Sequence, residues 1–294
     1  MFGGSIVAIV TPMHADGALD LPALGRLVEW HVEAGTAAVV VAGTTGESPC
    51  ISPDELDAMI RVALEAAAGR IGVIAGTGSN ATAHAVELTR IAAAAGAGAA
   101  LVVTPYYNKP TQEGLYRHYE AVAREGGLPV ILYNVPGRTA VDLLPETTAR
   151  LAEVTGVVAI KEAVPGPERA RRLRALCGDR LDLLSGDDAT AMDFLLAGGD
   201  GVISVTANVA PRLMHGMAEA ACHDEPRKAA ALNERLAGLH HALFVEPNPI
   251  PVKWVLMKMG LIEAGIRLPL TPLDPAHHDE VRAAMLRAGV EIKP

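Results

Sequence analysis

Short apolar runs alternate with longer amphipathic segments from the N-terminus to about residue 223. The short runs are rich in Val, Ile and Ala without polar alternation, which is typical of strands buried on both faces of a parallel sheet. Strands are expected at residues 5–10, 38–42, 71–75, 99–103, 129–133, 157–161, 181–185 and 201–205. Helical periodicity lies between them at residues 21–33, 53–68, 82–95, 112–125 and 145–153.

This regular alternation predicts a parallel sheet with helical crossovers. Eight such units in a chain of this length favour a closed (β/α)8 TIM barrel over an open, doubly wound sheet. The pattern changes after residue 224, where helical segments at 227–243, 250–259 and 275–288 follow one another without strands. We therefore expect a catalytic barrel in residues 1–224 and a helical C-terminal region in residues 225–294.

Composition narrows the range of partners and compartments. The net charge of −9 argues against nucleic acid, which requires a basic surface. No apolar run has the length of a membrane span, and the N-terminus shows no signal-peptide pattern. Cys50, Cys177 and Cys222 show neither disulfide nor zinc-ligand spacing, so we expect reduced thiols in a cytoplasmic protein and no bound metal.

The turn at residues 76–81, Gly-Thr-Gly-Ser-Asn-Ala, partly matches the dinucleotide fingerprint that follows a strand. That fingerprint requires an acidic residue about twenty positions further on, to hold the ribose. Glu87 is too near and Glu113 too far. We expect no nucleotide cofactor, and we interpret Asn80 as a helix N-cap or as a group that lines another pocket.

Lys161 is the one lysine, of six in the chain, that ends a predicted strand. Barrels build their active sites at the carboxyl ends of their strands, where a lysine loses part of its hydration. A neutral amine in that place can attack a carbonyl and form an imine. The alternative is a rim lysine that extends to solvent or pairs with Glu162. Successive strand residues point to opposite faces, so the pairing with Glu162 is disfavoured.

Other predicted strand ends carry polar groups. The turn at residues 43–48, Gly-Thr-Thr-Gly-Glu-Ser, offers hydroxyls and N–H groups to an anion, although it can also be an ordinary turn. Tyr133 ends the fifth strand and could transfer protons. Arg138 follows it and could bind a carboxylate, unless it is simply solvated. Gly186 follows the seventh strand and allows close backbone approach.

Tyr106 and Tyr107 lie between prolines in a loop after the fourth strand. Adjacent tyrosines in such a loop indicate an exposed aromatic segment, either near the site or packed on a neighbouring subunit. A rim lysine, a rim tyrosine, an anion turn and a loop arginine together suit carbonyl chemistry on a carboxylated substrate. The lysine would form an imine with a 2-oxo acid, and its enamine tautomer would be a carbon nucleophile.

Six segments together resemble the dihydrodipicolinate synthase family, within the N-acetylneuraminate lyase superfamily of class I aldolases. They span nearly the whole chain in order, at residues 43–48, 106–110, 133–139, 160–163, 185–188 and 201–208. The resemblance implies a (β/α)8 lyase with a C-terminal helical region. It also implies condensation of pyruvate with L-aspartate 4-semialdehyde in lysine and diaminopimelate biosynthesis, without a cofactor.

The resemblance also implies roles for individual residues. Lys161 would be the Schiff-base lysine, and a proton relay would comprise Tyr133, Thr44 and Tyr107, the last reaching in from a neighbouring subunit. Substrate would be bound by Thr45, Ile203, Gly186 and Arg138. The first three belong to the pyruvate site, and Arg138 would hold the carboxylate of the semialdehyde. A relay completed by a neighbour implies an oligomer, and the family is commonly a homotetramer built as a dimer of dimers.

Some members of this family are inhibited by lysine in a pocket between subunits. Ser48, Asn80 and Tyr106 match that pocket, and His84 occupies a fourth position of it. Sensitive bacterial members typically have Ala, His, His and Glu where this chain has Pro49, Pro53, Leu56 and His84. Without a carboxylate at position 84 the lysine ammonium loses a partner, so we expect weak or absent inhibition.

Two other functions remain open at this stage. One is an N-acetylneuraminate or 2-keto-3-deoxy sugar acid aldolase of the same superfamily, which would share the lysine and tyrosine. The other is an inactive barrel that serves as a binding or regulatory subunit. Tyr107 and Arg138 in their present motifs favour the synthase, and the intact set of Lys161, Tyr133, Thr44 and Arg138 disfavours an inactive barrel.

Overall fold

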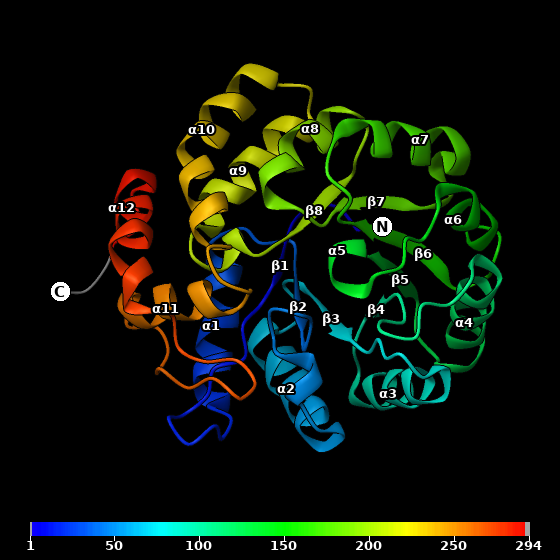
Figure 1. Cartoon of the computed structure of the whole chain (residues 1–294), viewed down its shortest axis with the longest axis horizontal. Helices are drawn as coiled ribbons and strands as arrows, with labels where there is room; N and C mark the ends of the chain where they lie inside the picture. Colours follow the sequence, from blue (N-terminus) through cyan, green and yellow to red (C-terminus); the bar gives the residue numbers. More distant parts are fainter. Residues whose placement is uncertain (1, 292–294) are drawn as a thin grey trace.

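A computed structural model describes residues 2–291 of the chain. Eight parallel strands form a closed barrel in which each strand pairs with the next and β8 pairs with β1, as the sequence predicts (Figure 1). The strands are β1 (Gly4–Ala8), β2 (Ala38–Val41), β3 (Gly72–Gly76), β4 (Ala99–Val103), β5 (Val130–Asn134), β6 (Val157–Glu162), β7 (Asp182–Ser185) and β8 (Gly201–Ser204).

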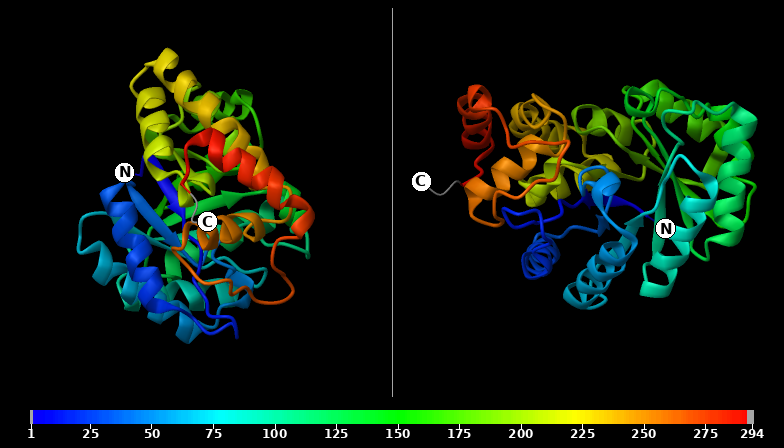
Figure 2. Two further views of the ribbon diagram at one scale, coloured as in Figure 1. Left: turned by 90° about the vertical axis from the view of Figure 1, so that its left-hand side faces the viewer. Right: turned by 60° about the horizontal axis from the view of Figure 1, so that its bottom comes forward.

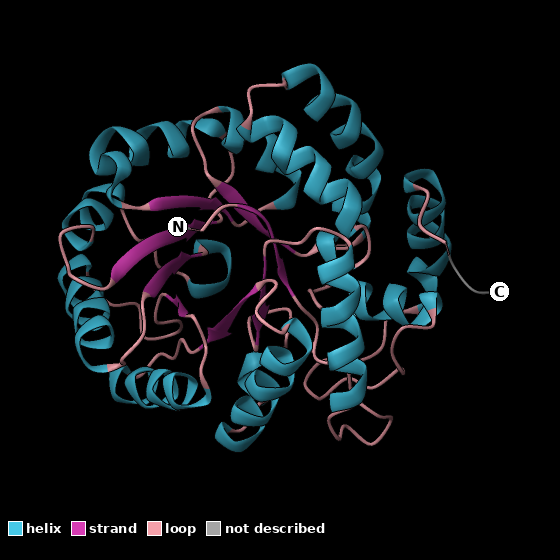
Figure 3. Ribbon diagram, turned by 180° about the vertical axis from the view of Figure 1, so that it is seen from behind, coloured by secondary structure: helices cyan, strands magenta, loops and turns pink. Residues whose placement is uncertain are grey.

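Helices surround the strands on the outside of the barrel, apart from the short α5 (Pro136–Thr139), which lies within the ring of strands in Figures 1 and 3. The barrel helices are α1 (Leu21–Glu33), α2 (Pro53–Ala67), α3 (Thr82–Ala95), α4 (Gln112–Glu125), α5 (Pro136–Thr139), α6 (Pro145–Leu151), α7 (Pro167–Cys177), α8 (Ala191–Leu196) and α9 (Pro211–Cys222). Short 3-10 turns lie at Ser48–Cys50, Gly178–Arg180, Asp188–Thr190 and Thr206–Asn208. The fold class predicted from the alternation is therefore confirmed.

Apolar side chains fill both sides of the barrel wall. One buried cluster has members from each of the eight strands, including Ile6, Ile74, Tyr133, Leu184 and Ile203. Two larger clusters, outside this one, join the other faces of the strands to the helices. Burial on both faces explains why the strands read as continuous apolar runs.

Local signals at two helix starts gave different outcomes. Ser52 and Glu55 form a reciprocal capping box at the start of α2, so the Ser52 side chain caps this helix. The prediction that Asn80 caps α3 is wrong, because the N-cap position is Ala81 and carries no side-chain cap. The Asn80 carbonyl instead accepts a hydrogen bond from Asn108.

The C-terminal region packs beside the barrel as α10 (Pro226–Ala242), α11 (Ile250–Met259), the 3-10 turn Pro275–His277 and α12 (His278–Ala288) (Figures 1 and 2). Leu236, Trp254 and Met285 of this region share one apolar cluster with barrel residues. Residues 292–294 of the predicted region 225–294 lie outside the described chain. Within residues 2–291, no helix combines the length and apolar character that a membrane crossing needs.

Candidate active site

Lys161 and Tyr133 lie side by side at the carboxyl ends of neighbouring strands. They are register partners on β6 and β5, and both are buried, with 5% and 6% of their surface exposed. The Lys161 amine nitrogen (Nζ) lies 4.3 Å from the centroid of the Tyr133 ring. Among the described residues, no carboxylate lies within ion-pair distance of this amine. The arrangement provides a buried amine beside a phenol.

Gly186 provides the space that the Lys161 side chain occupies. A Cβ atom at position 186 would lie 3.1 Å from both Cγ and Cε of Lys161 and 3.0 Å from the Ala163 side chain. Such distances are shorter than ordinary carbon–carbon contacts, which lie near 3.5–4.0 Å. A larger residue at 186 would therefore displace the lysine stem. This packing is a physical reason for glycine at the position.

Glu162 points away from Lys161, as the strand periodicity predicts. Its carboxylate is buried and accepts hydrogen bonds from Asn134 Nδ2 at 3.0 and 3.1 Å, from the Val164 amide at 2.8 Å and from Arg169 Nε at 3.0 Å. Burial raises the pKa of the Glu162 carboxyl, and Arg169 opposes part of that shift. These contacts anchor the carboxyl end of β6 through Glu162. They lie on the face of the strand opposite to Lys161.

The turn after β2 contributes hydroxyl groups to the same end of the barrel. Thr44 lines a small hollow together with Tyr133, Gly43 and Ser48. The next residue, Thr45, is fully buried. Gly76 is tight against this turn, because a Cβ there would lie 2.1 Å from the Ala42 carbonyl oxygen. The hydroxyl-rich turn thus shares a hollow with Tyr133, the register partner of Lys161.

Asn248 joins two of the predicted substrate-binding residues. Its side-chain amide donates a hydrogen bond to Thr45 Oγ1 at 3.0 Å, and its backbone carbonyl accepts one from Arg138 Nη2 at 3.4 Å. Because Thr45 accepts this bond, its own O–H is free to donate to an anion. Sequence analysis missed Asn248, which lies in the segment before α11.

A second missed contact links the C-terminal region to the turn at residues 43–48. Lys253 Nζ binds Glu47 Oε1 at 2.5 Å, and the two side chains are 5% and 0% exposed. Burial lowers the pKa of Lys253, and the neighbouring Glu47 charge opposes that change. Glu47 also accepts a hydrogen bond from the Arg267 amide at 3.0 Å. The signal in the sequence was a lysine inside the apolar helix 250–259, since a buried charge requires a partner.

The remaining predicted residues are spread over the rim. Ile203 is buried in the cluster inside the barrel. Tyr107 is 90% exposed and adopts a positive φ of 74°, so within this subunit it does not approach Lys161. Tyr106 and Asn80 are half-buried, and His84 is exposed, with its Nδ1 3.4 Å from Ser79 Oγ.

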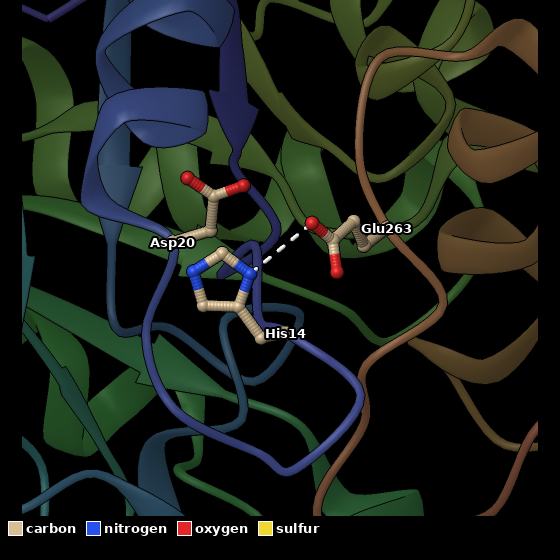
Figure 4. A group of neighbouring side chains, drawn as sticks. All are labelled: His14, Asp20 and Glu263. Carbon is tan, nitrogen blue, oxygen red and sulfur yellow. Dashed lines mark hydrogen bonds and ion pairs between the residues drawn. The ribbon is translucent and has the colours of Figure 1, made fainter.

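One group of potential metal ligands lies outside this site. His14, Asp20 and Glu263 place ligand atoms within 4.8 Å of one another (Figure 4). The sequence could not reveal this group, because Glu263 lies 249 positions after His14. None of the three residues is part of the arrangement around Lys161.

A closed parallel barrel with a buried lysine beside a tyrosine at the strand ends is the arrangement of the class I aldolases, which are imine-forming lyases. The sequence profile of the dihydrodipicolinate synthetase family matches residues 1–288. The chain belongs to this family.

Individual relatives agree with that assignment. The 4-hydroxy-tetrahydrodipicolinate synthase of Methylococcus capsulatus is 60% identical over 290 residues, which are 99% of this chain and 100% of the relative. The Acinetobacter baumannii dihydrodipicolinate synthase, solved with pyruvate, gives a TM-score of 0.97 at 51% identity, covering 99% of this chain and 100% of the other. The Cyanidioschyzon merolae enzyme, solved with lysine bound, gives 0.95 at 39% identity and covers 99% of both chains.

Proposed function

We propose that the chain is a 4-hydroxy-tetrahydrodipicolinate synthase that condenses pyruvate with L-aspartate 4-semialdehyde in lysine and diaminopimelate biosynthesis. The observation that carries this proposal is the buried Lys161 amine, 4.3 Å from the centroid of the Tyr133 ring. The chain has a second buried lysine, Lys253, but its amine is bound to Glu47. A carboxylate partner favours the charged form of an amine, which is not nucleophilic.

Lys161 is the nucleophile in the proposed reaction. Its neutral amine attacks the C2 carbonyl of pyruvate, and loss of water from the adduct leaves an imine. The protonated imine withdraws electrons from C3, so a C3 proton is released and an enamine forms. The enamine carbon then attacks the aldehyde carbon of the semialdehyde and forms the new carbon–carbon bond.

The proton transfers in these steps need hydroxyl groups near the amine. Tyr133 and Thr44 line one hollow beside Lys161 and supply two of them. Tyr107 of a neighbouring subunit would be the third. Its 90% exposure and its position in a loop at the rim support a side chain that projects out of its own subunit. The relay therefore requires at least a dimer, and we propose a homotetramer in the cytoplasm.

The two carboxylates of the substrates would be held at different depths. Thr45, with its O–H free to donate, and the backbone near Gly186 and Ile203 would hold pyruvate. Arg138 is exposed near the rim and would hold the semialdehyde carboxylate as it enters. Asn248 contacts both Thr45 and Arg138 and would set the distance between them.

Lysine is proposed to inhibit this enzyme weakly or not at all. The pocket residues Ser48, Asn80 and Tyr106 are half-buried, but the fourth, His84, is exposed and lies against Ser79. A histidine at this position offers no carboxylate to an ammonium group. Inhibition of the purified enzyme by submillimolar lysine would overturn this part of the proposal.

Substrate choice is tested by comparing turnover of pyruvate plus L-aspartate 4-semialdehyde with cleavage of N-acetylneuraminate and 2-keto-3-deoxygluconate. We expect turnover of the first pair alone. Preferential cleavage of either sugar acid would instead assign the chain to the aldolases of the same superfamily.

The shared relay is tested by subunit complementation. Lys161→Ala and Tyr107→Phe should each be nearly inactive. Hybrids refolded from a mixture of the two should recover about a quarter of wild-type activity, because half of the dimers are mixed and each carries one intact site. No recovery in verified hybrids would show that Tyr107 does not act across the subunit interface, and full activity of Tyr107→Phe alone would place Tyr107 outside the relay.

A further inference from the structure

His14, Asp20 and Glu263 form a cluster of potential metal ligands that the proposed reaction does not use. Their ligand atoms lie within 4.8 Å of one another, and the His14 Nδ1 to Glu263 Oε1 distance is 3.2 Å. His14 and Asp20 come from the loop before α1, and Glu263 comes from the segment after α11. Figure 4 shows the Glu263 carboxylate facing the imidazole ring and the Asp20 side chain next to the ring.

Backbone contacts hold the three residues in place. An antiparallel bridge between Met13 and Leu19 makes the loop a small hairpin, closed by a hydrogen bond from the His14 amide to the Ala18 carbonyl at 2.8 Å. The segment after Glu263 lies directly on this hairpin, since a Cβ at Gly265 would be 2.2 Å from the His14 carbonyl oxygen. These contacts therefore hold the hairpin and the segment after Glu263 in fixed positions relative to each other.

Asp20 is the buried member of the cluster, with 8% of its surface exposed. One of its oxygens, Oδ1, accepts a hydrogen bond from the Ala23 amide at 2.9 Å and caps α1. Within the described chain, the other oxygen has no hydrogen-bond donor. Two carboxylates this close repel each other, and a cation between them removes the repulsion. A protonated His14 satisfies Glu263 alone, through an ion pair between half-exposed side chains.

We propose that His14, Asp20 and Glu263 bind one Zn²⁺ ion. Zinc accepts imidazole nitrogen and carboxylate oxygen at about 2.0–2.2 Å in tetrahedral geometry, which places neighbouring ligand atoms about 3.3 Å apart. The His14–Glu263 distance of 3.2 Å already meets that value. A rotation of the Asp20 side chain completes three ligands, and a water molecule fills the fourth position.

The ion would fasten the C-terminal region to the barrel. Glu263 lies four positions before Arg267, whose Nε donates to the Gly17 carbonyl of the same hairpin at 2.9 Å and whose guanidinium binds Glu55. Zinc would thus strengthen the attachment of residues 263–267 to the hairpin. It would take no part in the chemistry at Lys161. Its expected effect is on thermal stability, because a ligand that binds the folded state alone stabilises it.

The test is Zn²⁺ titration by calorimetry on the full-length, untagged, EDTA-treated protein, with wild type compared with His14→Gln and Glu263→Gln. We expect one site in wild type, binding at least about tenfold weaker in both variants, and a rise in melting temperature with Zn²⁺ in wild type only. His241→Gln is the matched control, because His241 is exposed and, among the described residues, belongs to no group of three ligands whose atoms all lie within 4.8 Å of one another.

Co²⁺ as a second probe separates this site from the cysteines. Its spectrum should lack thiolate charge-transfer bands, because the proposed ligands are nitrogen and oxygen. Absence of a wild-type site, equal affinity in His14→Gln and Glu263→Gln, or a thiolate spectrum for the single site would each overturn the proposal.

Discussion

Lys161 and Glu162 are adjacent on β6, yet they serve opposite sides of the barrel wall. The Lys161 amine lies by the Tyr133 ring, whereas the Glu162 carboxylate binds Asn134 and Arg169. The period of two in a strand produces this separation. It keeps the Lys161 amine apart from the carboxylate of the next residue, while that carboxylate anchors the end of the strand.

Gly186→Ala should lower kcat about tenfold or more, because the new Cβ would displace the Lys161 stem from its present position. The melting temperature should change little. Gly137→Ala is the matched control, since a Cβ at Gly137 meets no atom within 4 Å. Equal steady-state kinetics of the two variants would show that position 186 does not place the lysine.

Asn248→Ala should raise the KM for pyruvate about tenfold, the equivalent of one hydrogen bond of about 1.4 kcal/mol. The loss follows because Thr45 would no longer be held with its O–H free to donate. Steady-state kinetics with Asn233→Ala as a control measures this effect. An unchanged KM in Asn248→Ala would remove Asn248 from the account of substrate binding.

Lys253→Met should lower the free energy of unfolding by about 3–5 kcal/mol, because it leaves the Glu47 charge buried without its partner. Urea denaturation measures the loss. The double variant Lys253→Met, Glu47→Gln should recover part of the stability, since the unpaired charge is then absent. A double variant no more stable than the single one would contradict this explanation.

Glu55 makes stability depend on acid pH. The Arg267 guanidinium lowers the pKa of the Glu55 carboxyl from 4.5 to about 2. A lowered pKa stabilises the folded state above the unfolded value of 4.5, and the contribution is lost as pH falls towards 2. Wild type should therefore exceed Glu55→Gln by about 1–2 kcal/mol at pH 6, and the difference should vanish near pH 2. Chemical denaturation across that range would refute the ion pair if the difference stayed constant.

The barrel could be predicted from sequence because its strands bury both faces and its helices bury one. The predicted bounds 21–33, 82–95 and 250–259 agree with α1, α3 and α11. Helix ends set by local geometry were harder to predict, as the wrong N-cap at Asn80 shows. The hydroxyl of Ser79 accepts a hydrogen bond from the Ala81 amide there.

Contacts between distant segments could not be predicted in this way. Asn248 and Thr45 are 203 positions apart, and Lys253 and Glu47 are 206 apart, so no periodicity links them. The sequence showed only that a lysine interrupts an apolar helix and that a glutamate follows a glycine turn. The closed barrel and the packed C-terminal region bring these partners together. As a result, Asn248 contacts Thr45 and Lys253 contacts Glu47.

The central claim is that Lys161 forms an imine with pyruvate, and trapping of that imine tests it most directly. The protein is incubated with pyruvate and borohydride, digested, and mapped by mass spectrometry, with Lys253 as the internal control for a buried lysine. We expect one reduced pyruvate adduct per chain on Lys161 and none on Lys253. An adduct elsewhere, or no adduct in enzyme that condenses both substrates, would contradict it.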